Sequence, residues 1–574
     1  MKKSLKRIMV LVCFMLYINS YAQMERDYSK FTITGKYSIP KAPAWCQNAV
    51  FYQIYPQTYY DTNADGIGDL KGIIEKLDYI KSLGVTAIWL NPFYESPFRD
   101  AGYDISDYYK VAPRYGTTED AKNLFSMAKA KGIRIIVDFV PGHTSIDHPW
   151  FKASADPKAN PYSNWYIWTN CTWFKGMDKY KSDFIQGYCN RDGNYMTNFF
   201  WHQPALNYGW GNPDPAHPWQ LPVNHPDVMN LREELKKIMR HWLDMGASGF
   251  RIDMAGSLVK NDPDQKIKEF WLEVRKMLDT EYPEAFIVSE WSYPINAMNA
   301  GFHADFFHWF GGFNDLCQRE TKRNQFSEGH SFFDQEGKGN ITNFLNNFYY
   351  HYNDTKDKGY ISIPIGNHDL IRINNSGRTV NDLEIISAFL LTMPGVPFIY
   401  YGDEIGMRQL DIKECKEGAY YTRAGARTPM QWDKTPNLGF SKSDASKLYF
   451  PVDAAADAPN VAEENNDPNS LLNKTRKLIQ IRSTEKSLSA YAEFVPVFAQ
   501  ENQYPFIYVR AADKERILVV LNPANQGKKT KIDLSINPKK MKLLAGNGIK
   551  ISMEGKETIV SSDPVSYAIF KYTE

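Results

Sequence analysis

Several short apolar runs of this sequence end in ionisable side chains. Strand cores seldom hold a charge unless it is paired or has a function. The chain has no HExxH zinc pattern and no Ser or Cys nucleophile motif, which leaves its carboxyl groups as the candidates. A carboxylic acid and a carboxylate about 5–5.5 Å apart cleave glycosidic bonds with retention. The pattern predicts this chemistry for a set that comprises Asp138, His143, Arg251, Asp253, Glu290, His368 and Asp369.

A second group of oxygen-bearing side chains lies in one loop, residues 61–69, which reads DTNADGIGD. Such alternation is typical of loops that wrap a hard cation, and it resembles the first half of an EF-hand. An EF-hand needs a bidentate Glu at loop position twelve, where Gly72 stands here. A calcium sensor is therefore excluded. A structural calcium clamp and a solvated acidic turn are the two readings left.

The elements that position these groups alternate along the chain. Eight short β-rich runs are separated by helical stretches, three of which end in LG, KG or MG, with Gly at the C-cap position. Eight units in about 360 residues favour a closed (β/α)8 TIM barrel over an open doubly wound sheet. Active sites of such barrels lie at the C-terminal ends of the strands. The expected strands are residues 49–56, 85–92, 133–140, 247–255, 284–290, 304–310, 360–369 and 396–404.

The spacing of these units also predicts the domains. About 90 residues rich in Trp, Tyr, Asn and Pro follow the third strand, which is too long for a bare loop. Short alternating strands replace the helical pattern near the C-terminus. We expect a barrel in two parts, residues 45–140 and 223–488, an inserted subdomain at 141–222, and a C-terminal antiparallel β-sandwich domain at 489–574. Residues 23–44 are an N-terminal extension.

The first 22 residues have the features of a secretory signal peptide. A basic head precedes an apolar run, Ile8 to Ile18, that is too short to span a bilayer, and Ser20-Tyr21-Ala22 fits a cleavage site. We expect export, to the periplasm or outside the cell, and no membrane insertion. Cys171 and Cys189 share one loop-rich region, so an oxidising compartment would let them pair, although inert free thiols are the alternative. A net charge of +1 gives no electrostatic case for nucleic acid.

Four segments resemble the signature regions of the α-amylase family, glycoside hydrolase family 13. They occur in the family's order and at the expected strand ends, and they read DFVPGH (138–143), GFRIDMA (249–255), VSEW (288–291) and GNHD (366–369). Further segments similar to family motifs are AGYD (101–104), QPALN (203–207), GVPFIYYGDE (395–404) and RTPMQW (427–432). The resemblance covers roughly residues 45–570 and implies the barrel fold.

The resemblance implies a role for each matching residue. Asp253 is expected to be the nucleophile and Glu290 the acid/base, with a pKa that its neighbours hold up. Asp369 is expected to hold sugar hydroxyls in the transition state, and Arg251 to orient Asp253 and keep it ionised. The other implied substrate contacts are hydrogen bonds from His143 and His368, stacking by Tyr103, and a clasp on the terminal glucose formed by Asp104 and Arg372.

The same resemblance implies a structural Ca²⁺ in the loop at residues 61–69. Its ligands are expected to be the side chains of Asp61, Asn63, Asp65 and Asp69 and the carbonyl oxygen of Ile67. Gly142 stands where many α-amylases have a calcium-binding Asn, so no second site is expected. Ala205 and Met254 also depart from the family patterns and leave the linkage undecided.

The implied activity is a retaining, exo-acting α-glucosidase that acts on α-gluco-oligosaccharides. A clasp on the chain end argues for exo action. The alternatives are a transglycosylase such as a trehalose-synthase-like isomerase, an endo-acting α-amylase, and a silent sugar-binding relative. Silent relatives usually lose a catalytic carboxylate, and all three stand here.

Overall fold

The computed structural model describes residues 31–174, 184–187, 189–308, 312, 314–318, 329–375, 377–420, 422–555 and 557–573. The expected signal peptide, residues 1–22, lies outside the described residues, as do residues 23–30 of the expected extension.

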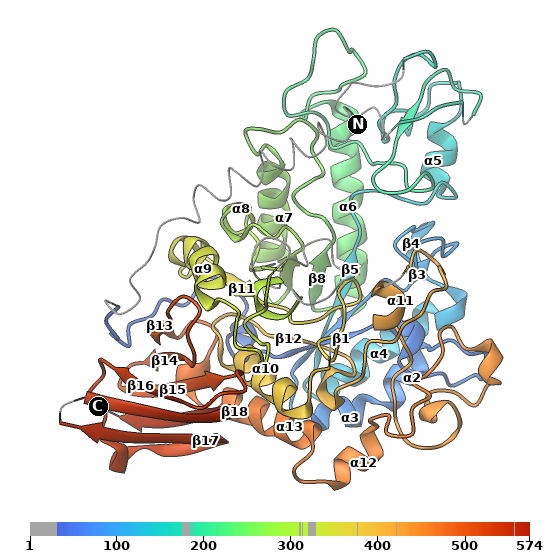
Figure 1. Cartoon of the computed structure of the whole chain (residues 1–574). Helices are drawn as coiled ribbons and strands as arrows, with labels where there is room; N and C mark the ends of the chain where they lie inside the picture. Colours follow the sequence, from blue (N-terminus) through green and yellow to red (C-terminus); the bar gives the residue numbers. More distant parts are fainter. Residues whose placement is uncertain are drawn as a thin grey trace, which may run out of the picture.

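Eight parallel strands form the sheet at the centre of the molecule (Figure 1). The strand order is β11-β10-β9-β8-β5-β2-β1-β12, and every paired register is parallel. The two end strands also approach each other, because a Cβ on Gly395, just before β12, would lie 1.8 Å from the carbonyl oxygen of Ile361 in β11. The predicted barrel is confirmed as a nearly closed one. Its strands are β1 Phe51–Ile54, β2 Ala87–Leu90, β5 Arg134–Phe139, β8 Gly249–Ile252, β9 Phe286–Ser289, β10 Ala304–Phe306, β11 Tyr360–Ser362 and β12 Phe398–Tyr400.

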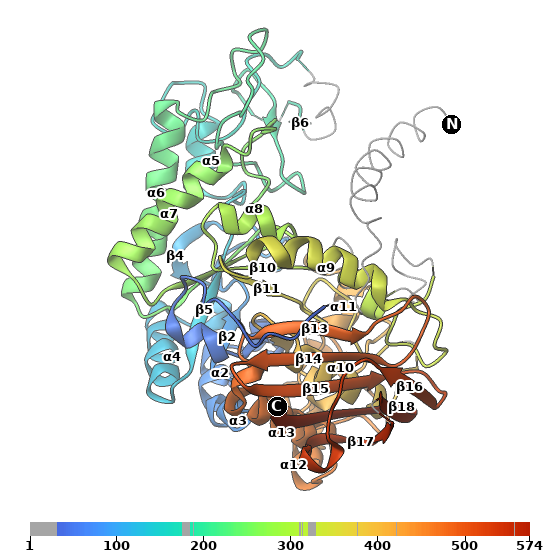
Figure 2. The same cartoon turned by 90° about the vertical axis from the view of Figure 1, so that its left-hand side faces the viewer.

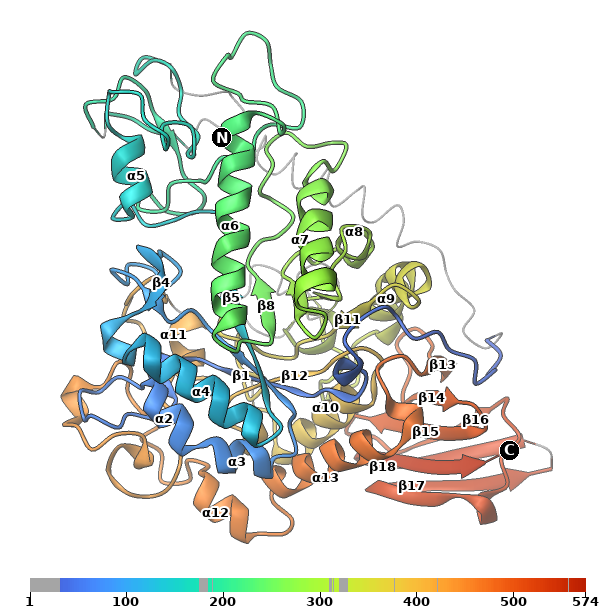
Figure 3. The same cartoon turned by 180° about the vertical axis from the view of Figure 1, so that it is seen from behind.

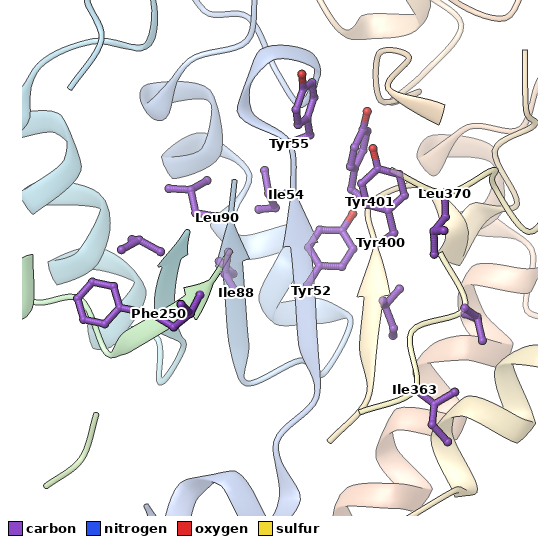
Figure 4. Packing of buried hydrophobic residues seen from close by; sticks show 14 of the residues in the cluster. Tyr52, Ile54, Tyr55, Ile88, Leu90, Phe250, Ile363, Leu370, Tyr400 and Tyr401 are labelled. Carbon is purple, nitrogen blue, oxygen red and sulfur yellow. The ribbon is translucent and has the colours of Figure 1, made fainter. Parts of the chain in front are cut away.

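Alternate side chains of these strands fill the barrel and cover its outside. The ring of Phe51 lies 4.4 Å from that of Phe398 on the neighbouring strand and 5.5 Å from that of Phe286 in β9, a strand that is not its neighbour in the sheet. Contacts of this kind need a closed, packed interior. Figure 4 shows the side chains on the outside of the barrel. Among them, Tyr52 and Ile88 belong to the core between the strands and the helices.

Helices surround the barrel on its outer side (Figure 3). The three glycines that were expected to end helices, Gly84, Gly132 and Gly246, all have positive φ, which a side chain with a Cβ rarely adopts. The long helix before β8 begins earlier than the apolar pattern suggests, because Pro226 starts it and His225 caps it. The helices are α2 Leu70–Glu75, α3 Leu77–Ser82, α4 Thr118–Ala130, α6 Pro226–Asp244, α7 Ile267–Glu281, α8 Pro294–Asn299, α9 Ile341–Thr355, α10 Val380–Thr392, α11 Thr422–Ala426, α12 Val461–Asn466 and α13 Leu471–Thr484.

Between β5 and α6 the chain leaves the barrel, at the top of Figure 1. Where the structure describes this segment, its regular elements are α5 Pro149–Ser154 and a two-stranded sheet of β6 Phe184–Ile185 and β7 Tyr195–Met196. An isolated bridge pairs His143 with Ala205 and so ties the far end of the segment back to the end of β5. A smaller pair, β3 Tyr94–Glu95 and β4 Asp107–Val111, follows β2.

The strands of the barrel are shorter than the apolar runs. The seventh run was expected to carry His368 and Asp369 at its end, but β11 stops at Ser362. Residues 363–367 continue as irregular backbone. Strand pairing therefore ends before the residues that carry the chemistry, and the remaining apolar residues of the run pack outside the ladder.

The C-terminal part is antiparallel, as predicted (Figure 2). Its strands form one six-stranded sheet in the order β13-β14-β15-β18-β16, with β17 on the other edge of β18. They are β13 Glu493–Phe498, β14 Phe506–Ala512, β15 Glu515–Asn522, β16 Lys528–Ile532, β17 Lys542–Glu554 and β18 Glu557–Thr573.

Two buried arginines, one from this sheet and one from α13, bind the end of α10. Arg510 of β14 donates hydrogen bonds to the carbonyl oxygens of Thr392 (2.5 Å) and Ser489 (2.7 Å). Arg482 of α13 donates to the carbonyl oxygens of Leu391 (2.9 Å) and Gly395 (2.6 Å). The last carbonyls of a helix have no partner within the helix, and here two guanidinium groups supply one.

The five cysteines of the described residues, Cys171 and Cys189 among them, are free thiols. The disulfide that their spacing allows is therefore not formed in this structure. Within the same residues, no helix has the length and apolar character needed to cross a membrane.

Candidate active site

Arg251 lies at the centre of the site and connects three carboxyl groups. Its Nη1 atom donates to Asp138 Oδ1 and to Asp253 Oδ1, both at 2.8 Å, and its Nη2 atom donates to Glu290 Oε2 at 2.5 Å. These side chains come from the ends of the adjacent strands β5, β8 and β9. One guanidinium therefore bridges Asp253 and Glu290 and holds the two carboxyls side by side, as the close pair of a retaining mechanism requires.

Burial and this single cation set the protonation of the cluster. Burial raises the pKa of Asp138 to about 6 and raises that of Asp253 well above its usual value, against the opposing effect of Arg251. Burial also acts to raise the pKa of Glu290, but Arg251 and His308 lower it to about 2. The expectation that the neighbours of Glu290 hold its pKa up is thus not met in this arrangement. In this arrangement burial favours the protonated form of Asp253, and Arg251 favours the charged form of Glu290.

A second group of side chains, two of them arginines, surrounds Asp369. Its Oδ1 atom accepts hydrogen bonds from Arg427 Nη2 and makes an ion pair with Arg423 Nε, both at 3.0 Å, and Oδ2 lies 3.1 Å from His368 Nε2. Burial opposes ionisation, but the charges of Arg423 and Arg427 hold the pKa of Asp369 well below its usual range. Asp369 is therefore a carboxylate at neutral pH and can accept hydrogen bonds from sugar hydroxyls.

Tyr103 connects the two halves of the site. Its hydroxyl donates to Asp138 Oδ2 at 2.9 Å and lies 2.6 Å from His368 Nε2, and its ring stacks on that of His368 with centroids 5.4 Å apart. His143 Nε2 lies 3.1 Å from the carbonyl oxygen of Tyr103. Burial lowers the pKa of His143 and of His368 to about 3, so both imidazoles are neutral at pH 7.

The structure does not bring the expected clasp of Asp104 and Arg372 together. Asp104 accepts hydrogen bonds from the backbone amides of Arg99 and Asp100, each at 3.0 Å, and so closes its own loop. Arg372 is fully buried and bonds Asp403 at 3.1 Å and the carbonyl oxygen of Tyr401 at 2.9 Å. This prediction was wrong, because the oxygens of Asp104 bind loop amides, while Arg372 is fully buried and its Nη1 atom binds Asp403 and Tyr401.

The groups beside Asp369 are instead Asp100, Arg423 and Arg427. Asp100 accepts a hydrogen bond from Gln203 Nε2 at 2.7 Å, and the charges of both arginines act against the rise in pKa that burial causes in Asp100. Gln203 belongs to the QPALN segment and Arg427 to RTPMQW, so the signal was present in motifs already identified. His308, whose Nε2 atom lies 3.6 Å from Glu290 Oε1, lies within the expected strand at residues 304–310 and was missed.

Arg427→Lys is expected to lower kcat/KM on α-glucosides by about 100-fold. Arg427 donates through separate nitrogens to Asp369 Oδ1, to the carbonyl oxygen of His368 (2.7 Å) and to Tyr55 (3.3 Å), and an ammonium group cannot reproduce this fork. Arg423→Lys is the matched control, because Arg423 touches the same oxygen from a side chain that is 37% exposed. Initial-rate kinetics on both variants would test this; equal losses would contradict it.

Both catalytic strands are followed by residues in strained backbone conformations. Met254, next to Asp253, has φ 43°, and Ser292, two residues after Glu290, has φ 58°. Side chains with a Cβ rarely adopt the left-handed region, and such residues persist only where surrounding contacts hold them.

The acidic loop after β1 is folded by its own oxygens. Asp61 accepts from the amides of Ala64 and Gly66 (both 2.8 Å), Asp65 from that of Ile67 (2.8 Å), and Asp69 from those of Thr62 (2.8 Å) and Gly72 (2.7 Å). The atoms of this loop that could bind a metal ion are oxygens, which suits Ca²⁺. Each carboxylate has lone pairs that these hydrogen bonds do not use. Among the described residues, however, no three His, Cys, Asp or Glu side chains are grouped as a metal site.

Comparisons with known proteins agree with this geometry. The chain matches the family model described as "Alpha amylase, catalytic domain" over residues 53–490. It is 33% identical over 502 residues to the trehalose synthase/amylase TreS of Mycolicibacterium smegmatis, covering 78% of this chain and 77% of that protein. It is 30% identical over 544 residues to the oligo-1,6-glucosidase of Parageobacillus thermoglucosidasius, covering 83% and 90%.

Among solved structures, the isomaltulose synthase of Erwinia rhapontici NX5 superposes with a TM-score of 0.77 at 26% identity, covering 93% of this chain and all of that one. The family match begins within β1 and continues past β12. It therefore includes the strands from β2 to β12 and the site residues described above. The chain therefore belongs to the α-amylase family, whose members are glycosidases and transglycosylases of this fold.

Proposed function

We propose that this protein is a retaining, exo-acting α-glucosidase that releases glucose units from α-gluco-oligosaccharides. The observation that carries the proposal is the cluster of charged side chains around Asp369, which Arg423, Arg427 and the buried Asp100 complete. Such a cluster binds the hydroxyls of a terminal sugar. An endo-acting enzyme would need room there for the next sugar of the chain.

The proposed reaction has two displacements. Glu290 donates its proton to the glycosidic oxygen while Asp253 attacks the anomeric carbon, so the leaving sugar departs and a covalent β-glucosyl intermediate forms. Glu290 then takes a proton from water, whose oxygen attacks the same carbon and releases Asp253. The first step needs the proton on Glu290. Substrate binding must therefore weaken the contact between Arg251 Nη2 and Glu290 Oε2, which lowers the pKa of Glu290 in this arrangement.

A sugar isomerase is the second candidate. It shares the first displacement, but a sugar instead of water resolves the intermediate. Similarity to proteins named trehalose synthase and isomaltulose synthase favours it, and similarity to oligo-1,6-glucosidase favours hydrolysis.

Product analysis by chromatography separates these candidates. The purified protein is incubated with maltose, isomaltose, sucrose, trehalose, maltoheptaose and soluble starch, one at a time. Early release of glucose from the small sugars supports the proposal and identifies the linkage. New disaccharides without net hydrolysis would make the protein an isomerase, and mixed maltodextrins from starch with untouched disaccharides would make it an endo-amylase.

We also propose that the loop at residues 61–69 binds Ca²⁺, and that residues 1–22 direct export. If Ca²⁺ binds the folded loop, EDTA treatment should lower Tm by about 2 °C or more and added Ca²⁺ should restore it. Asp65→Asn is the matched variant, since it keeps the shape and removes one charge. A Tm that changes neither with EDTA nor with added Ca²⁺ would contradict calcium binding by this loop. Mass spectrometry of the protein recovered outside the cytoplasm would test cleavage after Ala22.

A further inference from the structure

The strand after the acid/base carries a buried carboxyl group that the mechanism does not use. Asp305 lies in the middle of β10, with no exposed surface. Its Oδ1 atom accepts hydrogen bonds from Ser289 Oγ at 2.6 Å and from the amide of Trp291 at 3.0 Å. Ser289 and Trp291 are the two residues that flank Glu290. One oxygen atom of Asp305 therefore binds the residues on both sides of the acid/base, through the side chain of Ser289 and the backbone of Trp291.

The same carboxyl group acts on the turn that follows. Burial raises the pKa of Asp305 to about 7. The hydrogen bonds from Ser289 and Trp291 and the amides of Tyr293 and Ser292 act to lower this pKa but do not outweigh burial. Ser292 has the strained φ of 58°, which needs support from its surroundings. Asp305 Oδ2 is buried and has no hydrogen-bond partner among the described residues. A buried carboxyl kept at this cost calls for a purpose beyond packing.

A second side chain from the same segment completes the arrangement. His308 Nδ1 lies 3.2 Å from Ser292 Oγ, and its Nε2 atom lies 3.6 Å from Glu290 Oε1. The strand β10 and its continuation thus contact Glu290 through its flanking backbone and through its carboxyl group. Opposite them, Arg251 approaches Glu290 Oε2 from β8.

We infer that Asp305 is a positioning residue for the acid/base, which fixes Glu290 so that its proton points at the glycosidic oxygen. The inference rests on the proposed function. Asp305 touches no reacting atom, so its effect must pass through Glu290. Its loss should therefore matter in proportion to the acid catalysis that a substrate needs. A group that merely supported the barrel would affect all substrates alike.

The experiment compares Asp305→Asn with the unchanged protein on two α-glucosides that differ only in the leaving group. The methoxy group of methyl α-glucoside is a poor leaving group that needs a proton. The 2,4-dinitrophenolate of 2,4-dinitrophenyl α-glucoside leaves without one. We expect kcat/KM, which reports the first displacement, to fall about 100-fold on the first, the cost of a misplaced catalytic group, and less than about 5-fold on the second. In a Glu290→Gln background, Asp305→Asn should cause no further loss.

Equal losses on both substrates, or a full additional loss in the Glu290→Gln background, would overturn the inference. Ser289→Ala provides the second variant, because it removes one hydrogen bond and leaves the carboxyl in place; it should show the same preference with a loss of about 5-fold. If Asp305→Asn does not fold, Ser289→Ala decides by the same comparison. An unchanged protein that cleaves neither substrate would instead refute the proposed function.

Discussion

Asp253→Asn is expected to lower kcat by at least about 10⁴-fold on every α-glucoside, since it removes the atom that forms the covalent intermediate. The Asn side chain can still accept the hydrogen bond from Arg251 at the position of Oδ1. Substrate binding should therefore persist. Initial rates and isothermal titration with the substrate found by product analysis measure the two quantities, and retained turnover would remove Asp253 from the mechanism.

The same substitution has an expected effect on stability. Burial raises the pKa of Asp253 in the folded protein. A carboxyl with a raised folded pKa costs stability once the pH exceeds its unfolded pKa, and this cost is present at pH 7. Asn carries no such cost, so Tm at pH 7 should be unchanged or higher, while at pH values below about 4 the difference should vanish. A Tm that falls by several degrees at pH 7 would contradict this.

Glu290→Gln is the second substitution with a large expected effect. It should lower kcat at least about 10³-fold on maltose or a similar natural substrate, because general acid catalysis contributes about 10²–10⁴-fold and the variant also lacks the base for the second step. Azide needs no base. With 2,4-dinitrophenyl α-glucoside and azide, turnover should recover and yield α-glucosyl azide, the product of two inversions.

The stereochemistry of that product is the control. Proton NMR distinguishes the anomers of glucosyl azide. A β-glucosyl azide would mean a single inversion and would place the nucleophile elsewhere. No recovery by azide, in a variant whose Tm equals that of the unchanged protein, would mean that Glu290 is not the acid/base.

The sequence predicts the barrel because the spacing of its apolar residues follows from which side chains each strand and helix must bury. Apolar strand residues alternate between the interior and the helix layer, so that Phe51 and Tyr52 lie on opposite faces of β1. Gly84 and Gly132 mark helix ends because they adopt positive φ. Strand ends are not predicted in this way: the seventh run continues to Asp369 as an apolar pattern, whereas β11 ends at Ser362. Hydrophobicity reports burial, and burial continues after pairing stops.

Asp253 and Glu290 could be predicted because each follows its strand directly. The contacts around Asp369 could not, because they join distant loops. Asp100 and Arg427 come from opposite ends of the barrel sequence, and only the closed fold brings their charges together. Asp104 was preferred to Asp100 since it belongs to the AGYD motif, yet its oxygens close the loop that presents Asp100. A motif shows which residues matter, and the hydrogen bonds show what each does.

The arginines at the end of α10 bear on how the protein is made. Arg510 and the Thr392 carbonyl that it binds are 118 residues apart in the chain. A ribosome releases residues from the N-terminal end onward, so α10 emerges well before the side chain that satisfies its last carbonyls. The eighth strand follows that helix directly, and the helix end must wait for the C-terminal sheet. The catalytic barrel therefore reaches its final form only after the C-terminal sheet has been synthesised.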